Sequence, residues 1–330
     1  MNTKYFYMSS LLSMALTAGA DNTVYAQTEG QTSSPAQLVD ALHTTFGNHH
    51  SRAVHAKGII LEGSFTPAPD APKWTKAAHL QKEHSKVVIR FSDFTGIPDI
   101  PDNSGSANPR GLAIKFIMKD GKTTDIVGHS FNGFPTPNSD QFRELLLAIA
   151  ASGPDAAKPT KLDNFLGSHP VAKTFLTTQK LPASYATINY FGVNSFKFTT
   201  EKGNQHYIRY QFVPVEGEHL LTPDEFAQAG PEYLMEEIKA RVAKHPFKYK
   251  MYAEIAEEGD EIEDPSVAWP TTRKKVLLGT IEINKLATNT PEQDKALSFI
   301  PNNIPDGIET ADPMLNFRSK AYPVSVKERQ

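Results

Sequence analysis

Cysteine is absent from the 330 residues of this chain. The absence excludes disulfides, thiolate nucleophiles and zinc–thiolate sites. A metal ion would have to be held by histidine, a carboxylate, tyrosine, methionine or a prosthetic group. Long runs of like charge are also missing, and the formal net charge is only -3. This balance gives no sign of a nucleic-acid partner or of a polybasic membrane patch.

Long apolar runs are scarce too, apart from one near the N-terminus. Lys4 precedes an apolar stretch that reaches Leu16, and a Val-Tyr-Ala segment ending at Ala26 fits a cleavage site. The stretch is shorter than the roughly 20 apolar residues that a membrane span needs. We therefore expect residues 1–26 to be a secretory signal peptide, with no membrane association after cleavage. An exported protein without cysteine suits a periplasmic location.

Helix signals occur at several places in the sequence. Ser34 followed by Pro35 is typical of a helix start, and Gly47 is expected to end that helix. A second helix is predicted with Ser139 as its N-cap, and a third over residues 223–242. Short helical pieces are expected around 162–166 and 170–179, and the tail from residue 300 is expected to be extended chain with a short helix.

Strand signals outnumber helix signals. In Lys86–Ser92 the apolar residues alternate, so Arg90 and Ser92 share the face opposite the apolar one. Nine such segments are expected to form strands: 58–65, 86–92, 112–117, 124–128, 187–193, 195–200, 206–214, 247–255 and 276–283. Mostly hairpin-length connections predict an antiparallel β-barrel or β-sandwich with peripheral helices. Without internal repeats or composition shifts, residues 27–330 are expected to form one domain.

One stretch ahead of the first strand mixes charged, apolar and small residues. It runs Arg-Ala-Val-His-Ala-Lys-Gly over residues 52–58 and is followed by an apolar run. This pattern predicts a loop that brings His55 to the mouth of a β-strand. A lone histidine in such a place is no evidence of catalysis, because histidine is common in structural and surface positions.

Several motifs, taken in chain order, resemble the haem catalases. They are residues 52–58, Val-Ile-Arg90-Phe91-Ser92, Asn-Pro-Arg110-Gly111-Leu-Ala-Ile-Lys-Phe, Asp125-Ile-Val-Gly128, Ile300-Pro-Asn-Asn-Ile-Pro-Asp-Gly307-Ile-Glu309 and Arg318-Ser-Lys-Ala321-Tyr322-Pro323. The resemblance extends over roughly residues 45–324 and implies an α+β fold, an antiparallel β-barrel of about eight strands with peripheral helices. It is most similar to the small catalase-related peroxidases, which lack the C-terminal helical domain of larger catalases.

The resemblance implies a site built on haem b. Tyr322 would be the axial ligand of the iron, and Arg318, four residues earlier on the same helix face, would hydrogen-bond its phenolate. His55 would be the distal acid–base that moves a proton between the two oxygens of H2O2. Ser92 would orient His55 by a hydrogen bond.

Other matching positions imply contacts with the rest of the haem. Arg52 and Arg90 correspond to arginines that bind the two propionates, for which fork-shaped cations are suited. Val54 corresponds to a residue that packs over the haem face, and Phe142 to an aromatic residue that stacks near it.

The sequence departs from the family pattern at one distal position. The family has an asparagine there, whereas a gapless alignment puts His129 at that place and a shifted loop would bring Asn132 instead. The gapless alignment also brings Phe142 onto its counterpart and so favours His129. A changed distal group puts fast catalase turnover in doubt and favours oxidation of an organic donor.

The resulting prediction is a haem-dependent peroxidase that uses H2O2 to oxidise small organic donors, with weak catalase activity. A monomer or small homo-oligomer is expected, without nucleic-acid or membrane partners. Three alternatives remain open at this point. The first is a haem-binding or carrier protein without turnover, the second a haem lyase or isomerase acting on fatty hydroperoxides, and the third a structural barrel without haem.

Overall fold

Eight antiparallel strands close into a barrel in the computed structural model, which describes residues 32–288 and 291–329. Each strand pairs with the next in the chain, except that β4 and β5 meet through a single pair and β8 returns to β1. The strands are β1 (Gly58–Pro67), β2 (Ser85–Ser92), β3 (Gly111–Ile117), β4 (Thr123–His129), β5 (Tyr190–Thr199), β6 (Gln205–Pro214), β7 (Phe247–Ile255) and β8 (Lys275–Leu286). The expected barrel of about eight strands with peripheral helices is confirmed.

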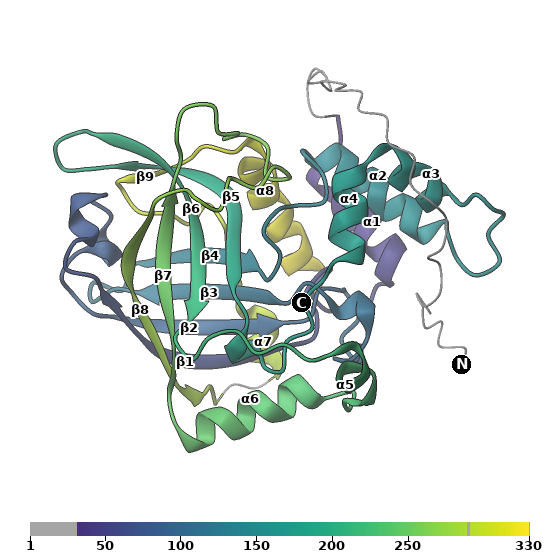
Figure 1. The fold of residues 1–330 in the computed structure, drawn as a ribbon, viewed down its shortest axis with the longest axis horizontal. Helices are drawn as coiled ribbons and strands as arrows, with labels where there is room; N and C mark the ends of the chain where they lie inside the picture. The colour runs from purple at the N-terminus through teal and green to yellow at the C-terminus, as the bar shows by residue number, and fades with distance from the viewer. Residues whose placement is uncertain (1–31, 289–290, 330) are drawn as a thin grey trace.

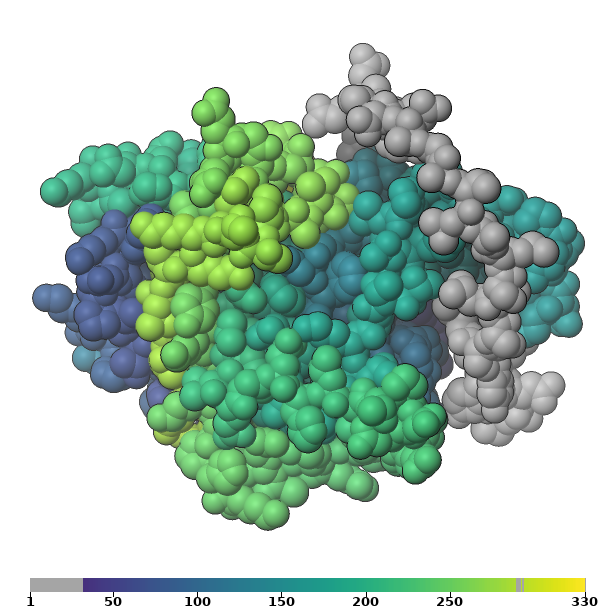
Figure 2. Space-filling view, in the orientation of Figure 1, coloured from purple at the N-terminus to yellow at the C-terminus, as the bar shows by residue number. Residues whose placement is uncertain are grey.

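The helices gather at one end of the barrel and along its lower side (Figure 1). They are α1 (Pro35–Phe46), α2 (Ser139–Ala150), α3 (Lys161–Ser168), α4 (Pro170–Thr177), α5 (Pro223–Gln228), α6 (Tyr233–Lys244), α7 (Pro291–Ala296) and α8 (Pro313–Glu328). In the space-filling view the segment carrying α5 and α6 forms the lower face (Figure 2). A short strand, β9 (Ile308–Thr310), pairs with β5 ahead of α8.

Alternation in β2 separates two environments. Val87, Ile89 and Phe91 belong to the apolar core of the barrel and are almost fully buried. Arg90 and Ser92 lie on the opposite, outer face, yet they are only 3% and 4% exposed. Arg90 donates to the carbonyl oxygens of His55 and Ala56 and contacts Asp294, so the loop before β1 and α7 cover this part of the outer face.

Helices α1, α2 and α8 meet in an apolar cluster of their own. Residues of α1 and α8 share it with Leu146 of α2, and Phe317 and Ala321 are the α8 members. Ser34 caps α1 through a capping box with Gln37, and Gly47 ends the helix with a φ of 89°, which favours glycine. Both ends of α1 are thus as the sequence predicts.

Other boundaries differ from the sequence prediction. Asn138, not Ser139, is the N-cap of α2, because its side-chain oxygen accepts a hydrogen bond from Gln141 N at 3.0 Å. The single helix expected over 223–242 is two helices, since Pro231 follows Gly230 and interrupts the pattern.

The last part of the chain also differs. The two strands expected over 187–193 and 195–200 form one strand, β5, with an irregular register between Gly192 and Phe196. The tail forms the 16-residue helix α8 instead of a short helix, and α8 continues through Pro323. The predicted signal peptide, residues 1–26, lies outside the described residues. Within the described ranges, no helix is long and apolar enough to cross a membrane.

Candidate active site

The loop before β1 fixes the position of His55 through its backbone. His55 has a φ of 58°, a left-handed conformation that is uncommon for residues other than glycine. Its N–H donates to the Phe94 carbonyl oxygen at 2.8 Å, and Ala56 N–H donates to the Thr95 carbonyl oxygen at 2.9 Å. These bonds fasten the loop to the chain that follows β2. Strained backbone of this kind often occurs at functional sites.

The imidazole of His55 is oriented by hydrogen bonds on one side only. Nδ1 lies 3.0 Å from the Asp93 carbonyl oxygen and 3.1 Å from Ser92 Oγ. Because a carbonyl only accepts, Nδ1 carries the proton and Nε2 keeps its lone pair. Burial first, with smaller effects from His129 and Arg90, lowers the pKa of His55 to about 3. The ring is therefore a neutral base at ordinary pH.

Paired residues of β2, β3 and β4 form the surface beneath this imidazole, which we call the floor of the site. Ser92, Gly111 and His129 are paired across β2, β3 and β4, so they form one row on the outer face. The next row on this face consists of Arg90, Ala113 and Val127. Small residues in the middle of both rows leave the floor flat.

His129 presents a polar atom without a partner. Its Nδ1 accepts a hydrogen bond from Phe131 N–H at 3.3 Å, so Nε2 carries the ring proton. Nε2 is buried and has no hydrogen-bond partner within the described part of the chain. Burial and then the charge of Arg318 lower the pKa of His129 to about 3, which keeps the ring neutral. His129 thus has a free N–H donor.

Helix α8 brings a phenol to the same cavity. Arg318 Nη2 donates to Tyr322 Oη at 2.9 Å, as expected for residues four apart on a helix. Arg318 Nη1 donates to the side-chain oxygen of Asn194 at 2.7 Å. The amide of Asn194 in turn donates to Asp312, the N-cap of α8. The guanidinium beside the phenol is therefore held at two points.

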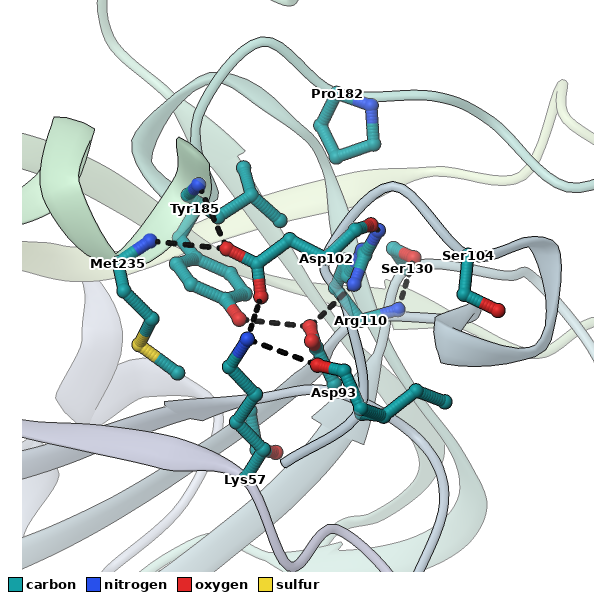
Figure 3. Close-up of polar contacts among 12 residues, drawn as sticks. Lys57, Asp93, Asp102, Ser104, Arg110, Ser130, Pro182, Tyr185 and Met235 are labelled. Carbon is teal, nitrogen blue, oxygen red and sulfur yellow. Dashed lines mark hydrogen bonds and ion pairs between the residues drawn. The ribbon is translucent and has the colours of Figure 1, made fainter. Parts of the chain in front are cut away.

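A buried charged cluster lies behind the His55 loop (Figure 3). The carboxylate of Asp93 pairs with Arg110 and accepts a hydrogen bond from Tyr185 Oη at 2.7 Å. Lys57, two residues after His55, pairs with Asp102 at 2.7 Å. Burying a charge in this way is costly unless it is paired. Removing one member of a pair leaves the other as an unpaired buried charge. The cluster fixes both chain segments that position the imidazole.

Three arginines meet at another edge of the cavity. Arg52 and Arg90 contact the carboxylate of Asp294, and Arg329 Nη2 donates to the Leu297 carbonyl oxygen at 2.9 Å. Burial and then the charge of Arg52 lower the pKa of Arg90 to about 9 and that of Arg329 to about 10. Arg90 and Arg329 therefore remain charged at neutral pH, and together with Arg52 they make this edge suited to an anion.

A single cavity joins these features. It has a volume of about 200 Å³, and most of its lining is apolar. The sequence-predicted residues that line it are Arg52, Val54, His55, Arg90, Ser92, His129, Phe142, Arg318 and Tyr322. Asn132 is not among the described residues that line it. Between the two residues considered for the second distal position, the structure brings His129 to the cavity.

Some site residues were missed by the sequence analysis. Arg329 is the C-cap of α8, seven residues after Tyr322, so helical spacing could have found it once the tail was read as one helix. Asn194 and Asp294 carry no such signal, because their partners are distant in sequence. In the described chain, no group of three or more histidines and carboxylates has metal-site geometry.

Comparisons with known proteins identify the family of this chain. The Catalase family model matches residues 20–330. A catalase-related peroxidase of Mycolicibacterium paratuberculosis is 33% identical over 90% of this chain and 95% of its own length. One of Synechococcus elongatus is 31% identical over 90% and 88%.

Solved structures show the same fold. A fungal catalase superposes with a TM-score of 0.75 at 21% identity, over 84% of this chain and 59% of its own chain. A bacterial catalase has a TM-score of 0.75 at 22% identity, with coverage of 84% and 57%. The chain thus spans somewhat over half the length of these catalases.

Proposed function

Because this chain belongs to the catalase family and is an enzyme of it, we propose that it is a haem-dependent peroxidase. It uses H2O2 to oxidise small organic donors and has weak catalase activity. One observation carries the proposal: His55, Tyr322 and the arginine cluster, which are far apart in sequence, line the same cavity.

The residues of the cavity fit haem b. A porphyrin is flat and apolar and carries two carboxylates, which matches a flat floor and an edge of three arginines. Tyr322 would hold the iron as phenolate, and Arg318, 2.9 Å from its oxygen, would temper the basicity of that ligand. Arg52, Arg90 and Arg329 would hold the carboxylates, with Val54 and Phe142 against the ring. When bound, haem supplies the two-electron oxidising chemistry that side chains lack.

His55 acts as the acid–base for peroxide. Its unprotonated Nε2 takes the proton from one oxygen of H2O2 and returns it to the other oxygen, which leaves as water. The hydrogen bonds of Nδ1 to Asp93 and Ser92 keep the ring in the tautomer that this transfer requires. The pKa of about 3 keeps the base unprotonated through the acid range.

His129 is the second distal group in this proposal. Its partnerless Nε2–H is suited to donate a hydrogen bond to an oxygen of peroxide. An imidazole is larger than an amide and leaves less room to hold a second H2O2 in place. Organic donors then supply the two electrons that complete turnover, and the balance is one H2O2 and two donor hydrogens to two waters.

The location and assembly of the protein are part of the same proposal. The apolar N-terminal stretch and the absence of cysteine support export to a periplasm. The proposed assembly is a monomer or small homo-oligomer. Fractionation of cells that express the full sequence, followed by mass spectrometry of the N-terminus, tests export and cleavage after Ala26. Light scattering of the purified protein gives its assembly.

Absorbance spectra test the central proposal. The protein purified with haem should show a Soret band, a change on addition of H2O2, and a return when a phenolic donor is added. His55→Ala should keep the Soret band and lose turnover by about 10²- to 10⁴-fold, the usual contribution of a general acid–base. Unchanged turnover in that variant would point to a carrier protein, and rearrangement of a lipid hydroperoxide without donor would point to a lyase or isomerase.

A further inference from the structure

The arginine edge of the cavity already holds a carboxylate, and that carboxylate belongs to the chain. Arg52 Nη1 lies 2.8 Å from Asp294 Oδ2, and Arg90 Nε lies 3.3 Å from Asp294 Oδ1. Arg52 Nη2 also donates to the Asp294 carbonyl oxygen at 2.7 Å and to the Leu297 carbonyl oxygen at 2.9 Å. The end of α7 is thus fastened to the cavity by its carboxylate and two carbonyls.

These contacts use the donors that an incoming anion would need. The Nη atoms of Arg90 already donate to the carbonyl oxygens of His55 and Ala56 at 2.8 and 2.9 Å, so Nε is the donor directed at the carboxylate. Arg52 likewise directs both of its Nη atoms at α7. A second carboxylate cannot take these positions while Asp294 holds them.

The charges at this edge are unequal. Among the described residues, Arg52 and Arg90 pair with the carboxylate of Asp294 and Arg329 also interacts with it, so positive charge is in excess at this edge. The Nε of Arg329 is buried and lacks a hydrogen-bond partner in the described residues. A dianion would neutralise this edge better than Asp294 alone does. Replacement of the Asp294 carboxylate by the two carboxylates of a dianion is therefore favourable.

We propose that Asp294 is an internal ligand of the arginine site, and that a carboxylate of the incoming porphyrin displaces it from Arg52 and Arg90. This inference rests on the proposed haem-binding function and names a residue that sets the affinity of the site. Without a porphyrin, Asp294 compensates part of the buried positive charge and holds α7 against the cavity. Porphyrin binding must then break the contacts of Asp294 with the arginines. The net affinity of the site for porphyrin is therefore lower than the arginines alone would give.

Removal of the charge on Asp294 tests the proposal in the full chain prepared without haem. Metal-free protoporphyrin IX is the main probe, because it carries both carboxylates and cannot bind Tyr322 through iron. Asp294→Asn should lower its Kd about tenfold, the effect of one lost charge-assisted contact in the competing state. The variant should also lower the melting temperature of the porphyrin-free protein by roughly 2 °C and leave that of the loaded protein unchanged.

Matched probes and variants separate the possible results. Protoporphyrin IX dimethyl ester lacks the carboxylates, so Asp294→Asn should not improve its binding. Asp294→Glu keeps the charge and should bind protoporphyrin nearly as the wild type does. Asp306→Asn, which removes an exposed carboxylate paired with Lys76, controls for the loss of any negative charge.

The results also separate this inference from the function on which it rests. Equal or weaker binding of protoporphyrin by Asp294→Asn, with haem bound normally by both proteins, would overturn the role of Asp294 and leave the haem function standing. Failure of the wild type and the variant to bind either haem or protoporphyrin would overturn both.

Discussion

Gly111 lies against His55 with no room for a side chain. A Cβ atom built on Gly111 would lie 2.6 Å from His55 Nδ1 and would also meet Ser92 Oγ. Real Cβ atoms do not approach so closely, so the imidazole and the hydroxyl both depend on a glycine at this place in β3. Glycine is required at 111 because the side chains of His55 and Ser92 approach it closely. Its backbone dihedral angles do not require glycine, since Gly111 is in regular strand pairing with Ser92.

Gly111→Ala should therefore displace the imidazole of His55 while leaving the barrel intact. A displacement of about 1 Å at a reacting group costs on the order of 10²-fold in rate, so peroxidase kcat/KM should fall by that factor. The Soret band should be retained, because the residues proposed to hold the iron and the carboxylates, Tyr322 and the arginine edge, are unchanged. Gly167→Ala in α3, where nothing lies within 4 Å of the added carbon, is the control. Wild-type kinetics in Gly111→Ala would contradict a fixed position of His55.

A second prediction concerns the identity of the other distal group. His129→Leu removes the partnerless Nε2–H while filling similar volume, and should slow the reaction with H2O2 by roughly 10- to 100-fold, as loss of one charge-stabilising donor does. His129→Asn should recover part of the rate, because an amide also donates. Stopped-flow absorbance after mixing with peroxide measures the step directly.

Asn132→Ala serves as the comparison for that series. Asn132 is outside the described cavity lining, so its removal should change the rate less than twofold, an effect worth under about 0.4 kcal/mol. A larger loss in Asn132→Ala than in His129→Leu would reverse the assignment.

The buried charges behind the site lead to a prediction about stability. Arg110→Met leaves the carboxylate of Asp93 buried without its cation and should cost about 3–5 kcal/mol in the free energy of unfolding. Tyr185→Phe removes one hydrogen bond to the same carboxylate and should cost only about 1–3 kcal/mol. Urea unfolding of the three proteins measures both. Equal losses would mean that the ion pair is not what holds Asp93.

Local patterns in the sequence predict the parts of the fold that depend on local rules. The alternation over 86–92 separates the core face of β2 from the face that carries Arg90 and Ser92, and helical spacing brings Arg318 onto Tyr322. The N-cap of α2 was misplaced by one residue, because Asn138 and Ser139 are both good caps and only side-chain geometry decides.

Contacts across long sequence separations have no local signal. Lys57 and Asp102 pair inside the protein, and so do Arg90 and Asp294, but neither pair follows a helix or strand period. Their presence depends on how the barrel brings loops together. For the same reason the residues of the cavity could be proposed from resemblance to a family, while the partners that hold them could not.

The last prediction concerns acid stability and His79. This residue is 1% exposed, packs on Phe116 at a ring-centroid distance of 5.0 Å, and has no hydrogen-bond partner for either ring nitrogen among the described residues. Burial lowers the pKa of His79 from 6.5 to about 3. Between these two values the unfolded chain binds a proton that the folded protein does not.

The stability contribution of neutral His79 is therefore fully present above pH 6.5 and is lost as the pH falls through this range toward 3. One such group gives a slope of about 1.4 kcal/mol per pH unit in the free energy of unfolding. His79→Leu should flatten the measured slope between pH 4 and 6 by about that amount, with urea unfolding at several pH values as the measurement. His245→Leu, which removes an exposed imidazole, gives the background. An unchanged slope in His79→Leu would mean that the buried ring opens to solvent and is protonated before the protein unfolds.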